Sequence, residues 1–558
     1  MIEKSLAPVD AKTFPQLVRA AAAAYGDELA LTLKGETIPD DEITFSGLER
    51  KSAEIARGLI ARGVGKGTRI GFIQGNGPTF AVLLAAIARI GGVAVPISTL
   101  IKANELVRVL RQSDIAGLIV QRSLLGHDFV QRLLDAIPSL NDTQSPDLRI
   151  VETPYLRWIA SSGPQLPPSF SDIAEFTTLA ASVSEELLVG AEAEVHATDQ
   201  MLEIYTSGSM ALPKGVKHLH GPVVFRAGYL AKMLGTVRGG KSAAVLPMFW
   251  VGGMSIYLLP NWITGACTVC TEGTPTSSRY AMGTVLAAED LAALRQNKPF
   301  WALGMSETFG PYSYADELRA PSYPLCAPID HVAERYEVRI ADPETNLPVA
   351  DGEAGEIQVR GYALSPALHK LEREAYYTVD GFYHTGDMGL KDGERIHFVG
   401  RNGDMIKTAG SNVSPAEVEQ EMQLLPGIHS AYVVGLPDDQ RGQLVVAAIV
   451  ARDGGVVDTA AIEAELKKRL SSFKVPRAYV QITREEVPML PSNKVSRRQI
   501  EALLAEKLDR CIDLQTDDLF QRQASAACAA LNPVREHEAG GAGIADTRHM
   551  GKRNTPAR

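Results

Sequence analysis

The chain is poor in cysteine and carries a deficit of positive charge. Its five cysteines are spread over 558 residues, which is too few for the disulfide framework of a small secreted domain. Asp and Glu number 66 against 56 Lys and Arg, and the net charge is −10. Binding to a nucleic-acid backbone needs concentrated Lys and Arg, so we expect no nucleic-acid partner.

Long apolar runs are also lacking. The longest, residues 80–96, is interrupted by Arg89 and Gly91 and falls short of the roughly 20 apolar residues that a membrane-spanning helix needs. Residues 1–8 do not have the charged-then-apolar pattern of a signal peptide. We expect no membrane span and a cytoplasmic location.

Cys267 and Cys270 form a Cys-x-x-Cys pair. A zinc site needs four ligands, and no second pair or nearby histidine accompanies this one. We therefore predict that both cysteines are buried strand residues.

The remaining composition is typical of a globular protein. Apolar residues make up 45% of the chain, charged residues 22% and aromatic residues 6%. These values exclude collagen, low-complexity and mostly disordered proteins. At roughly 150 residues per domain, the length allows about three or four domains' worth of chain.

Residues 1–150 alternate between helical and strand-like patterns. Ser46 is predicted to cap a helix, with Glu49 completing a capping box. Short, continuously apolar strands are predicted at 69–73 and 93–97, on either side of a buried helix at 80–90. This alternation indicates an α/β domain with a buried, parallel-rich sheet.

The later parts of the chain have other patterns. Residues 137–200 are rich in Pro, Ser, Thr and acids and are predicted to form a surface connector. The segments 336–340 and 356–360 alternate apolar and polar residues, which is typical of antiparallel strands with one solvated face. A small α+β unit is predicted from about 404, with a helix from about 459.

These patterns predict an α/β protein in three parts. A large N-terminal domain, residues 1–403, contains several subdomains, with parallel-rich sheets and helices plus a small antiparallel β-region. A small α+β domain, residues 404–507, follows it. Residues 508–558 lose periodicity, so we predict a disordered tail.

Residues 235–242, Gly-Thr-Val-Arg-Gly-Gly-Lys-Ser, fit the phosphate-binding pattern G-x-x-x-x-G-K-[ST]. That loop needs a strand before it and a helix after it, because the helix N-terminus meets the phosphates. Here a helix-like segment, 225–234, comes first and a strand-like segment, 243–247, comes second. We therefore reject a nucleotide site at this place.

A better candidate lies upstream. The strand-like segment 201–205 leads into Thr-Ser-Gly-Ser at 206–209, and Pro-Lys-Gly follows at 213–215. The hydroxyl groups and the lysine can bind a polyphosphate. On its own, this segment is equally consistent with a Ser/Gly-rich surface turn.

Segments further along the chain supply the missing context. Five of them, in this order, resemble the signatures of the acyl-adenylate-forming superfamily, which includes acyl-CoA synthetases, peptide-synthetase adenylation domains and beetle luciferases. They are residues 205–216, 303–308, 383–387, 400–407 and 491–494. The similarity extends over roughly residues 10–507.

The resemblance implies an acyl-CoA synthetase that uses ATP, Mg²⁺ and coenzyme A. Such an enzyme activates a carboxylic acid, here expected to be a fatty or aryl acid, by attack on the α-phosphate of ATP. The acyl-adenylate then passes its acyl group to coenzyme A, and AMP and pyrophosphate are released. Catalysis consists mainly of positioning and of stabilising charge on phosphate oxygens.

The resemblance also implies roles for single residues. The β- and γ-phosphates are expected to be bound by Thr206, Ser207, Gly208, Ser209 and Lys214. Ser306 and Glu307 are expected beside the α-phosphate, with Glu307 helping to hold Mg²⁺. Asp387 is expected to accept both ribose hydroxyls. Arg401 is expected to reach the ribose or the phosphates, and Lys407 to belong to the same cofactor-binding set.

Two further roles involve the small domain, which the resemblance implies is mobile. Lys494 is expected to neutralise the charge that develops during adenylation. Gly403 stands at the position about which members of the superfamily rotate the small domain. The backbone freedom of glycine is compatible with such a hinge.

The sequence departs from the superfamily pattern in four places. Met210 and Ala211 replace a Thr-Gly pair of the phosphate loop. Leu303 replaces a tyrosine expected beside adenine, and Trp250 replaces a histidine of many members. The region between residues 270 and 300 is also shorter than usual. These departures leave open a catalytically impaired or non-catalytic relative that binds nucleotide or acyl groups.

A second alternative is a stand-alone adenylation enzyme that loads a separate carrier protein. No complete phosphopantetheine site follows the small domain: the segment 517–525 lacks the Gly-Gly that precedes the serine of such a site. Coenzyme A is therefore the expected acceptor.

Overall fold

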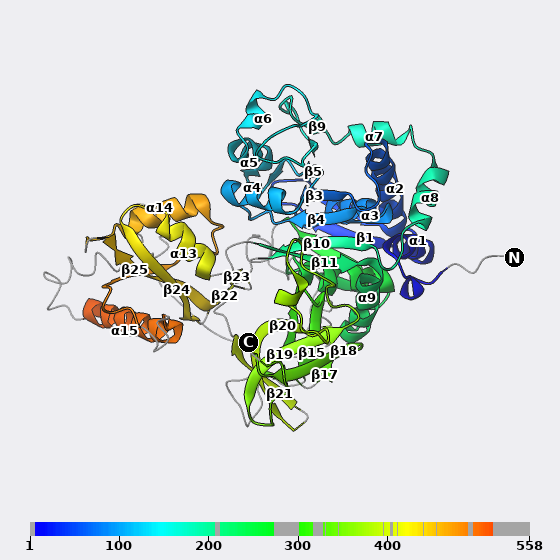
Figure 1. The fold of residues 1–558 in the computed structure, drawn as a ribbon. Helices are drawn as coiled ribbons and strands as arrows, with labels where there is room; N and C mark the ends of the chain where they lie inside the picture. Colours follow the sequence, from blue (N-terminus) through cyan, green and yellow to red (C-terminus); the bar gives the residue numbers. More distant parts are fainter. Residues whose placement is uncertain are drawn as a thin grey trace, which may run out of the picture.

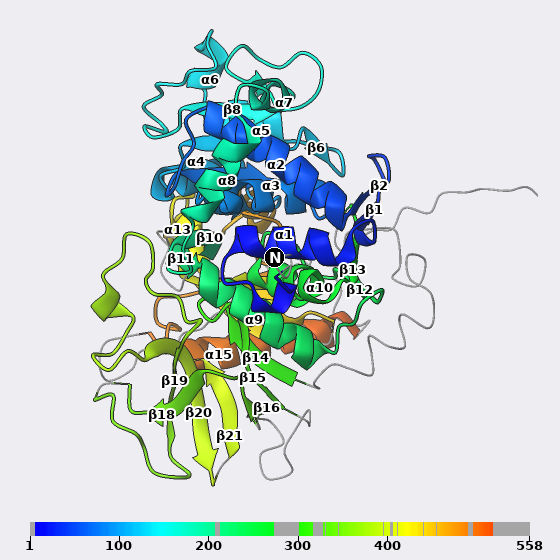
Figure 2. The ribbon, with the colours of Figure 1, turned by 90° about the vertical axis from the view of Figure 1, so that its right-hand side faces the viewer.

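The computed structural model shows a mixed α/β protein (Figures 1 and 2), which confirms the predicted fold class. It describes residues 6–206, 213–272, 301–315, 327–329, 331–343, 345–393, 395–401, 406–409, 411–413, 415–438, 440–452, 455–488 and 495–516. None of the helices in these ranges combines the length and the apolar character needed to cross a membrane.

A seven-stranded sheet forms the base of the N-terminal half. Its strands, in spatial order, are β11 (Lys214–Leu219), β10 (Gln200–Thr206), β4 (Val93–Ile97), β3 (Arg69–Ile73), β5 (Gly117–Val120), β8 (Trp158–Ser161) and β9 (Ser171–Asp172). All neighbouring strands are parallel except β10 and β11. The strands β3 and β4 have the bounds expected from the sequence.

Helices cover both faces of this sheet. Successive residues of β4 point to opposite faces: Ala94 joins a hydrophobic core with α3, whereas Val93 and Val95 join a core with α4 and α5. The helices of this region are η1 (Pro8–Asp10), α1 (Phe14–Tyr25), α2 (Phe45–Ala61), α3 (Pro78–Arg89), α4 (Ala103–Gln112), α5 (Phe129–Ala136), α6 (Ser139–Asp142), α7 (Glu175–Ala180) and α8 (Glu185–Ala193). Burial on both faces explains why these strands are continuously apolar.

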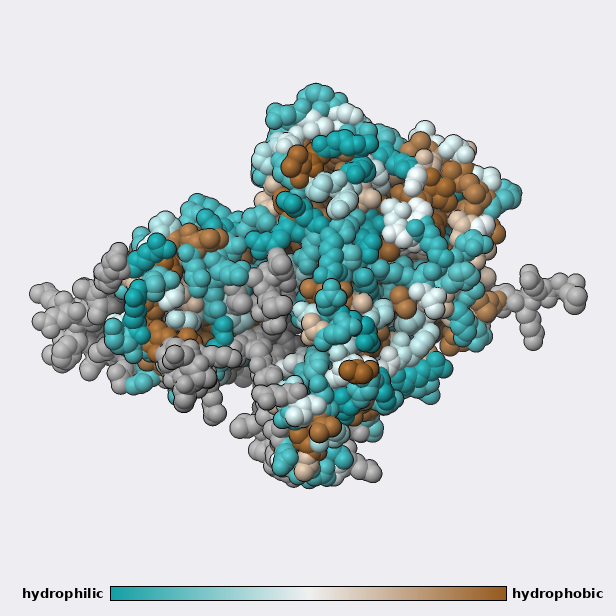
Figure 3. All heavy atoms as spheres, in the orientation of Figure 1, coloured by the Kyte–Doolittle hydropathy of each residue, from teal (hydrophilic) through white to brown (hydrophobic). Residues whose placement is uncertain are grey.

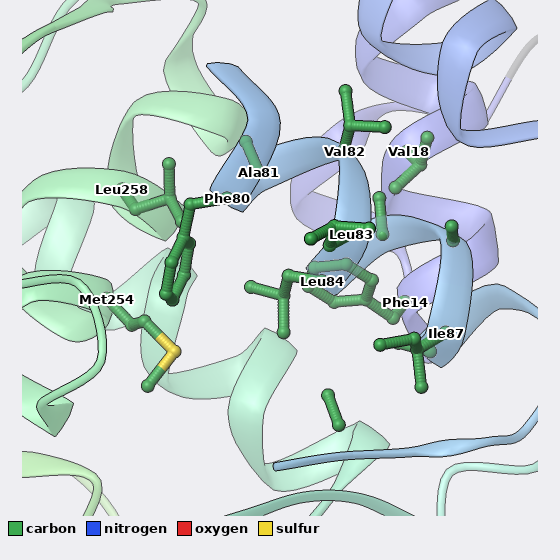
Figure 4. Close-up of a cluster of buried hydrophobic side chains, with 14 of the residues drawn as sticks. Phe14, Val18, Phe80, Ala81, Val82, Leu83, Leu84, Ile87, Met254 and Leu258 are labelled. Atoms are coloured by element: carbon green, nitrogen blue, oxygen red, sulfur yellow. The ribbon is translucent and has the colours of Figure 1, made fainter. Parts of the chain in front are cut away.

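Helix α3 is buried on nearly all sides, as predicted. Figure 4 shows Phe80 beside Met254 and Leu258 in the core. Arg89, at the end of the helix, is fully buried and forms an ion pair with Glu192. A buried guanidinium needs such a partner, because an unpaired buried charge is strongly destabilising.

The start of α2 differs from the prediction. Its N-cap is Thr44, whose side-chain oxygen accepts a hydrogen bond from the N–H of Gly47 at 3.0 Å. Ser46 lies inside the first turn, and Glu49 forms an ion pair with Arg89 at 2.8 Å. The strand before the helix ends at Thr44, so the helix begins two residues earlier than expected.

The predicted surface connector at 137–200 is also partly wrong. Residues 158–161 form β8, and all four are buried between β5 and β9. The apolar part of this strand is too short to be recognised in the sequence, because its flanks are polar and rich in proline. A small hairpin of β6 (Ser123–Leu124) and β7 (His127–Asp128) lies earlier in the chain.

A second sheet has four strands. They are, in order, β12 (Lys241–Ala243), β13 (Cys267–Thr271), β1 (Leu29–Lys34) and β2 (Asp41–Thr44). Cys267 and Cys270 are buried, unpaired residues of β13, as predicted. Helix α9 (His220–Leu234) precedes the segment 235–242, and β12 ends it. This order confirms that the segment is not a nucleotide-binding loop.

Two antiparallel sheets follow. The first contains β14 (Trp301–Met305), β15 (Gly310–Ala315) and β17 (His331–Val332). The second contains β16 (Ala327–Ile329), β21 (Arg395–Arg401), β20 (Tyr383–Asp392), β19 (Ala354–Gly361) and β18 (Tyr336–Ala341). The antiparallel pairing of β18 with β19 confirms the strands predicted at 336–340 and 356–360. Further helical segments are η2 (Gly253–Leu258), α10 (Leu259–Thr264) and η3 (Arg373–Ala375).

The C-terminal part is a separate α+β unit (Figure 1). Its sheet contains β23 (Ser411–Val413), β22 (Ile406–Thr408), β25 (Gly442–Ala451) and β24 (Ile428–Asp438), with β26 (Ala478–Ile482) also beside β25. Its helices are α13 (Pro415–Gln423), α14 (Thr459–Arg469) and α15 (Arg497–Thr516). Helix α14 begins where the sequence predicts. Helix α15 continues past the boundary expected at residue 507, and residues 517–558 lie outside the described residues.

Candidate active site

A pocket lies at the carboxyl ends of two strands of the seven-stranded sheet. Strands β4 and β10 lie side by side and run parallel. Their last residues, Ile97 and Thr206, line a pocket of about 380 Å³. Ligands of open α/β sheets bind outside the carboxyl ends of the strands. The pocket is therefore the candidate active site.

Residues from the N-terminal part of the chain and from the C-terminal unit line this pocket together. One wall is apolar and consists of Leu246, Phe249, Trp250 and Val251. The rings of Phe249 and Trp250 meet edge to face, with their centroids 5.6 Å apart. The C-terminal unit supplies Ser411, Glu417, Ser471, Phe473 and Lys474. In this arrangement the pocket is therefore lined by residues of both units.

Thr206 and Lys214 flank the predicted phosphate loop. They are directly opposite each other in the antiparallel pair of β10 and β11. Thr206 lines the pocket, and the Nζ of Lys214 lies 4.4 Å from the centre of the Tyr376 ring. Ser207, Gly208 and Ser209 lie outside the described residues, between these two anchors.

Ser306 and Glu307 lie in the turn between β14 and β15. Ser306 lines the pocket. Glu307 is nearly buried, and its Oε1 accepts a hydrogen bond from the hydroxyl of Tyr383 at 2.8 Å. The main-chain carbonyl of Glu307 accepts a second bond, from the N–H of Ser365 at 2.7 Å. The first contact orients the carboxylate, and the second holds the main chain of the turn.

The tyrosine that holds Glu307 stays protonated. Burial, followed by the neighbouring Glu307 carboxylate, raises the pKa of Tyr383 well above its ordinary value of 10.0. Nearby, burial lowers the pKa of His218 to about 3. Its ring packs edge to face on Phe309, with centroids 4.9 Å apart. His218 is therefore neutral at physiological pH, and a hydrogen bond links its ring to the backbone of Ser306.

Asp387 and Arg401 are brought together by the antiparallel sheet. They are directly opposite each other on β20 and β21. Asp387 is 2% exposed, and its N–H donates to the Oγ1 of Thr385 at 3.0 Å. Lys407 is exposed on β22, with its Nζ 5.4 Å from the centre of the Phe398 ring. Lys494 and Gly403 lie outside the described residues.

Sequence patterns did not reveal the segment between β19 and β20. It supplies Ser365, Tyr376 and Tyr377, and it packs between the hairpin of β10 and β11 and the turn that carries Glu307. The rings of Tyr377 and Tyr383 lie 5.1 Å apart. The unusual density of tyrosines at 376–383 is the one signal in the sequence that could have indicated it.

A comparison with models of known protein families identifies the family of this chain. The model of the AMP-binding enzyme family matches residues 18–291, and that of the AMP-binding enzyme C-terminal domain matches residues 417–494. Together they cover more than half of the chain. This chain belongs to the AMP-binding enzyme family. The resemblance seen in the sequence is thereby confirmed.

Relatives of this AMP-binding enzyme include CoA ligases of different substrate classes. A feruloyl-CoA synthase of an Amycolatopsis species is 26% identical over 82% of this chain and 93% of its own length. A long-chain-fatty-acid–CoA ligase of Bacillus subtilis is 24% identical over 88% of this chain and 95% of its own length.

A solved structure shares the fold of this AMP-binding enzyme. The o-succinylbenzoate CoA synthetase of Bacillus subtilis, bound with a product analogue, superposes with a TM-score of 0.65. It is 21% identical and covers 87% of this chain and 98% of its own. At this identity the likeness shows the fold alone.

The donor set of this AMP-binding enzyme fits a magnesium ion that is shared with phosphates. No group of three or more His, Cys, Asp or Glu that could hold a metal occurs in the part of the chain that the structure describes. Mg²⁺ is usually bound by one or two carboxylates together with substrate phosphates and water. Glu307 follows Ser306 in the chain, and its carboxylate together with the Ser306 hydroxyl is such a partial set of oxygen ligands.

Two of the departures from the superfamily pattern have visible consequences. Leu303 does not line the pocket, because it packs in a hydrophobic cluster with Tyr312 and Ile329. Trp250 lines the pocket. The altered pair at 210–211 and most of the short region between residues 270 and 300 lie outside the described residues.

Proposed function

We propose that this AMP-binding enzyme is an ATP-dependent carboxylate–CoA ligase. It activates a carboxylic acid as an acyl-adenylate and transfers the acyl group to coenzyme A. The observation that supports this most directly is the convergence of Thr206, Ser306 and an apolar wall on one pocket at the carboxyl edge of the sheet. The hydroxyl groups suit phosphates, and the apolar wall suits the body of the acid.

The residues of this chain act mainly by positioning. Thr206, Ser207, Gly208, Ser209 and Lys214 bind the β- and γ-phosphates of ATP, and Lys214 offsets part of their charge. Asp387 accepts the ribose hydroxyls, and Arg401 contacts the ribose or the phosphates, with Lys407 nearby. The carboxylate of the acid then attacks the α-phosphate next to Ser306, and pyrophosphate leaves.

Glu307 would hold Mg²⁺ in this reaction. When bound, the ion neutralises part of the phosphate charge and so lowers the cost of bringing the carboxylate close. The hydrogen bond from Tyr383 keeps one oxygen of Glu307 engaged, which leaves the other oxygen as the ligand.

Lys494 and Gly403 complete the proposal. Lys494 donates to the oxygens that become more negative during adenylation. Gly403 acts as the hinge that lets the C-terminal unit take different positions in the two half-reactions.

The apolar wall favours a fatty or aryl acid. Phe249 and Trp250 supply aromatic side chains to this wall, and Leu246 and Val251 supply aliphatic ones. None of these four side chains can pair with a second charge on the acid. A second charge of a dicarboxylate or an amino acid would be unpaired if it lay against this wall, which costs several kcal/mol.

A panel of acids tests the proposal. ATP–pyrophosphate exchange is measured with fatty and aryl acids. Formation of CoA thioester is then measured after addition of coenzyme A, with a reaction that lacks coenzyme A as the blank. We expect exchange with at least one apolar acid and thioester from that same acid. ATP binding without exchange would instead indicate a non-catalytic relative. Exchange with transfer only to a carrier protein would indicate a stand-alone adenylation enzyme.

A further inference from the structure

A cluster of buried charges joins α4 to the C-terminal unit. The Nζ of Lys474 donates to Oε1 of Glu105 at 2.6 Å and to Oε1 of Glu417 at 2.9 Å. The hydroxyl of Ser471 donates to Oε2 of Glu105 at 2.9 Å. Glu105 belongs to the N-terminal half of the chain, and the other three belong to the C-terminal unit. We call these four residues the interdomain charge cluster.

The cluster is shielded from water. The side chains of Glu105, Glu417 and Lys474 are about one-tenth exposed. Burial alone would lower the pKa of Lys474, but Glu105 and Glu417 offset this and raise it. Lys474 therefore stays charged. A buried ion pair of this kind is costly to break, because either partner alone would be an unpaired buried charge.

The local structure sets the position of each charge. Oε2 of Glu105 also accepts the N–H of Lys102 at 3.0 Å, which fixes the carboxylate at the first turn of α4. Glu417 lies in the first turn of α13, where a negative charge suits the helix dipole. The cluster is therefore made of pre-positioned groups that meet only in one arrangement of the two units.

A weaker set of charges surrounds the cluster. Glu421 lies 3.5 Å from Arg108 of α4 and 3.6 Å from Arg469 of α14. The two arginines are more than one-third exposed, and exposed ion pairs contribute little. On the face shown in Figure 3, hydrophilic residues lie on both sides of this junction. Of the ion pairs that join α4 to the C-terminal unit in the described residues, that of the cluster is the shielded one.

The same cluster forms part of the pocket. Glu105, Glu417, Ser471 and Lys474 line it together with Thr206 and Ser306. One cation between two carboxylates adds no net positive charge with which to neutralise a triphosphate, and Arg108, which also lines the pocket, is paired with Glu421. An acyl-adenylate has a single phosphate, so it suits this closed arrangement better than ATP does.

We propose that Glu105 and Lys474 are positioning residues, whose ion pair closes the C-terminal unit over the pocket in the arrangement that serves transfer of the acyl group to the thiol. The catalytic part rests on the proposed function, whereas the closure itself does not. Neither residue takes part in bond making. Their role is to complete the pocket wall that contains Phe473 and Ser411.

The test uses the full chain with Glu105→Gln and Lys474→Met. Closure is measured as a distance distribution between two labels, one on α5 and one on α14. We expect both variants to open, and Lys474→Met to open further, because it leaves two carboxylates facing each other. Glu465→Gln, which removes an exposed charge of α14, is the matched control and should stay closed.

The activity test separates the two half-reactions. Thioester formation from chemically prepared acyl-adenylate should fall at least about tenfold in both variants, as expected for loss of one partner of a buried pair. ATP–pyrophosphate exchange should change by less than about threefold, because this step does not use the closed arrangement. Lys474→Arg, which keeps the charge, should restore most of the closure and of the transfer rate.

Several results would overturn the proposal. Unchanged distances in Glu105→Gln and Lys474→Met would exclude the closing role. An equal loss in both half-reactions, or a failure of Lys474→Arg to rescue a folded protein, would exclude a specific role in transfer. If the wild-type chain shows no exchange with any acid, the proposed function fails, and the distance measurements still decide whether the cluster closes the molecule.

Discussion

Glu272, the residue after β13, joins three segments that are distant in the sequence. Its Oε2 accepts the N–H groups of Glu36 at 2.7 Å and Thr37 at 2.6 Å, and its Oε1 accepts that of Leu125 at 3.0 Å. The residue is 1% exposed. Burial alone would raise the pKa of Glu272, but the hydroxyl of Thr37 and these N–H groups lower it to about 2.

Replacing Glu272 should change the acid stability of the protein. The folded-state pKa lies below the ordinary value of 4.5, so the stabilisation is present above pH 4.5 and is lost as the pH falls toward 2. We expect Glu272→Gln to lower the free energy of unfolding by on the order of 2 kcal/mol at pH 7. Denaturant titrations of both proteins from pH 7 to pH 3 measure the difference, which should shrink with falling pH. A constant difference would contradict the assigned role.

Asp387 offers a test of the nucleotide site. We expect Asp387→Ala to raise the KM for ATP about tenfold or more, since it removes a hydrogen-bonding charge from the proposed ribose contact. Steady-state kinetics at saturating acid measure this. Asp392→Ala, on the exposed end of the same strand, is the control and should leave KM unchanged. An unaltered KM in Asp387→Ala would refute the ribose contact.

At the scale of elements, sequence patterns succeed where burial is uniform along a segment. Strands β3 and β4 and helix α14 were predicted at their observed positions, because an apolar run or a periodic helix face marks each of them. Strand β8 was missed because it is short and has polar flanks, so no apolar run long enough to predict a strand appears in the sequence. The loop that carries Ser365 and Tyr376 has no periodicity, and its position depends on contacts with remote strands.

The cap of α2 shows how a local pattern can mislead. Ser46 and Glu49 have the spacing of a capping box, yet Thr44 accepts the hydrogen bond from Gly47. We expect Thr44→Ala to lower the free energy of unfolding by about 1 kcal/mol, the usual cost of losing an N-cap. Ser46→Ala should change it by less than about 0.5 kcal/mol, since the residue lies within the helix. Equal effects in the two variants would contradict this assignment.

At the scale of the whole molecule, the pocket combines residues from about position 96 to position 474. The superfamily signatures led to Thr206 and Ser306, which the structure places on the same pocket. They did not lead to Glu105 or Lys474, because neither residue belongs to a signature and their contact spans the two halves of the chain. Contacts of this kind depend on the three-dimensional arrangement of whole domains.

Lys494 tests whether the C-terminal unit supplies catalytic charge. We expect Lys494→Ala to reduce ATP–pyrophosphate exchange by at least about 100-fold, since it removes a donor to developing phosphate charge. Transfer from chemically prepared acyl-adenylate should change far less. Circular dichroism checks the fold, and Lys468→Ala, on exposed α14, is the control. Normal exchange in Lys494→Ala would refute the role.

The pairing of β1 with β13 has a consequence for synthesis of the chain. Leu31 of β1 lies opposite Thr268 of β13, so the partner of an early strand is made much later. At roughly 5–20 residues per second, the ribosome needs on the order of 10 to 50 s to reach it. During that time one edge of β1 lacks its native neighbour, and such edges favour association with other chains. Faster synthesis of the segment between β1 and β13 should therefore increase the yield of folded protein. A chaperone that covers residues 29–34 during synthesis should have the same effect.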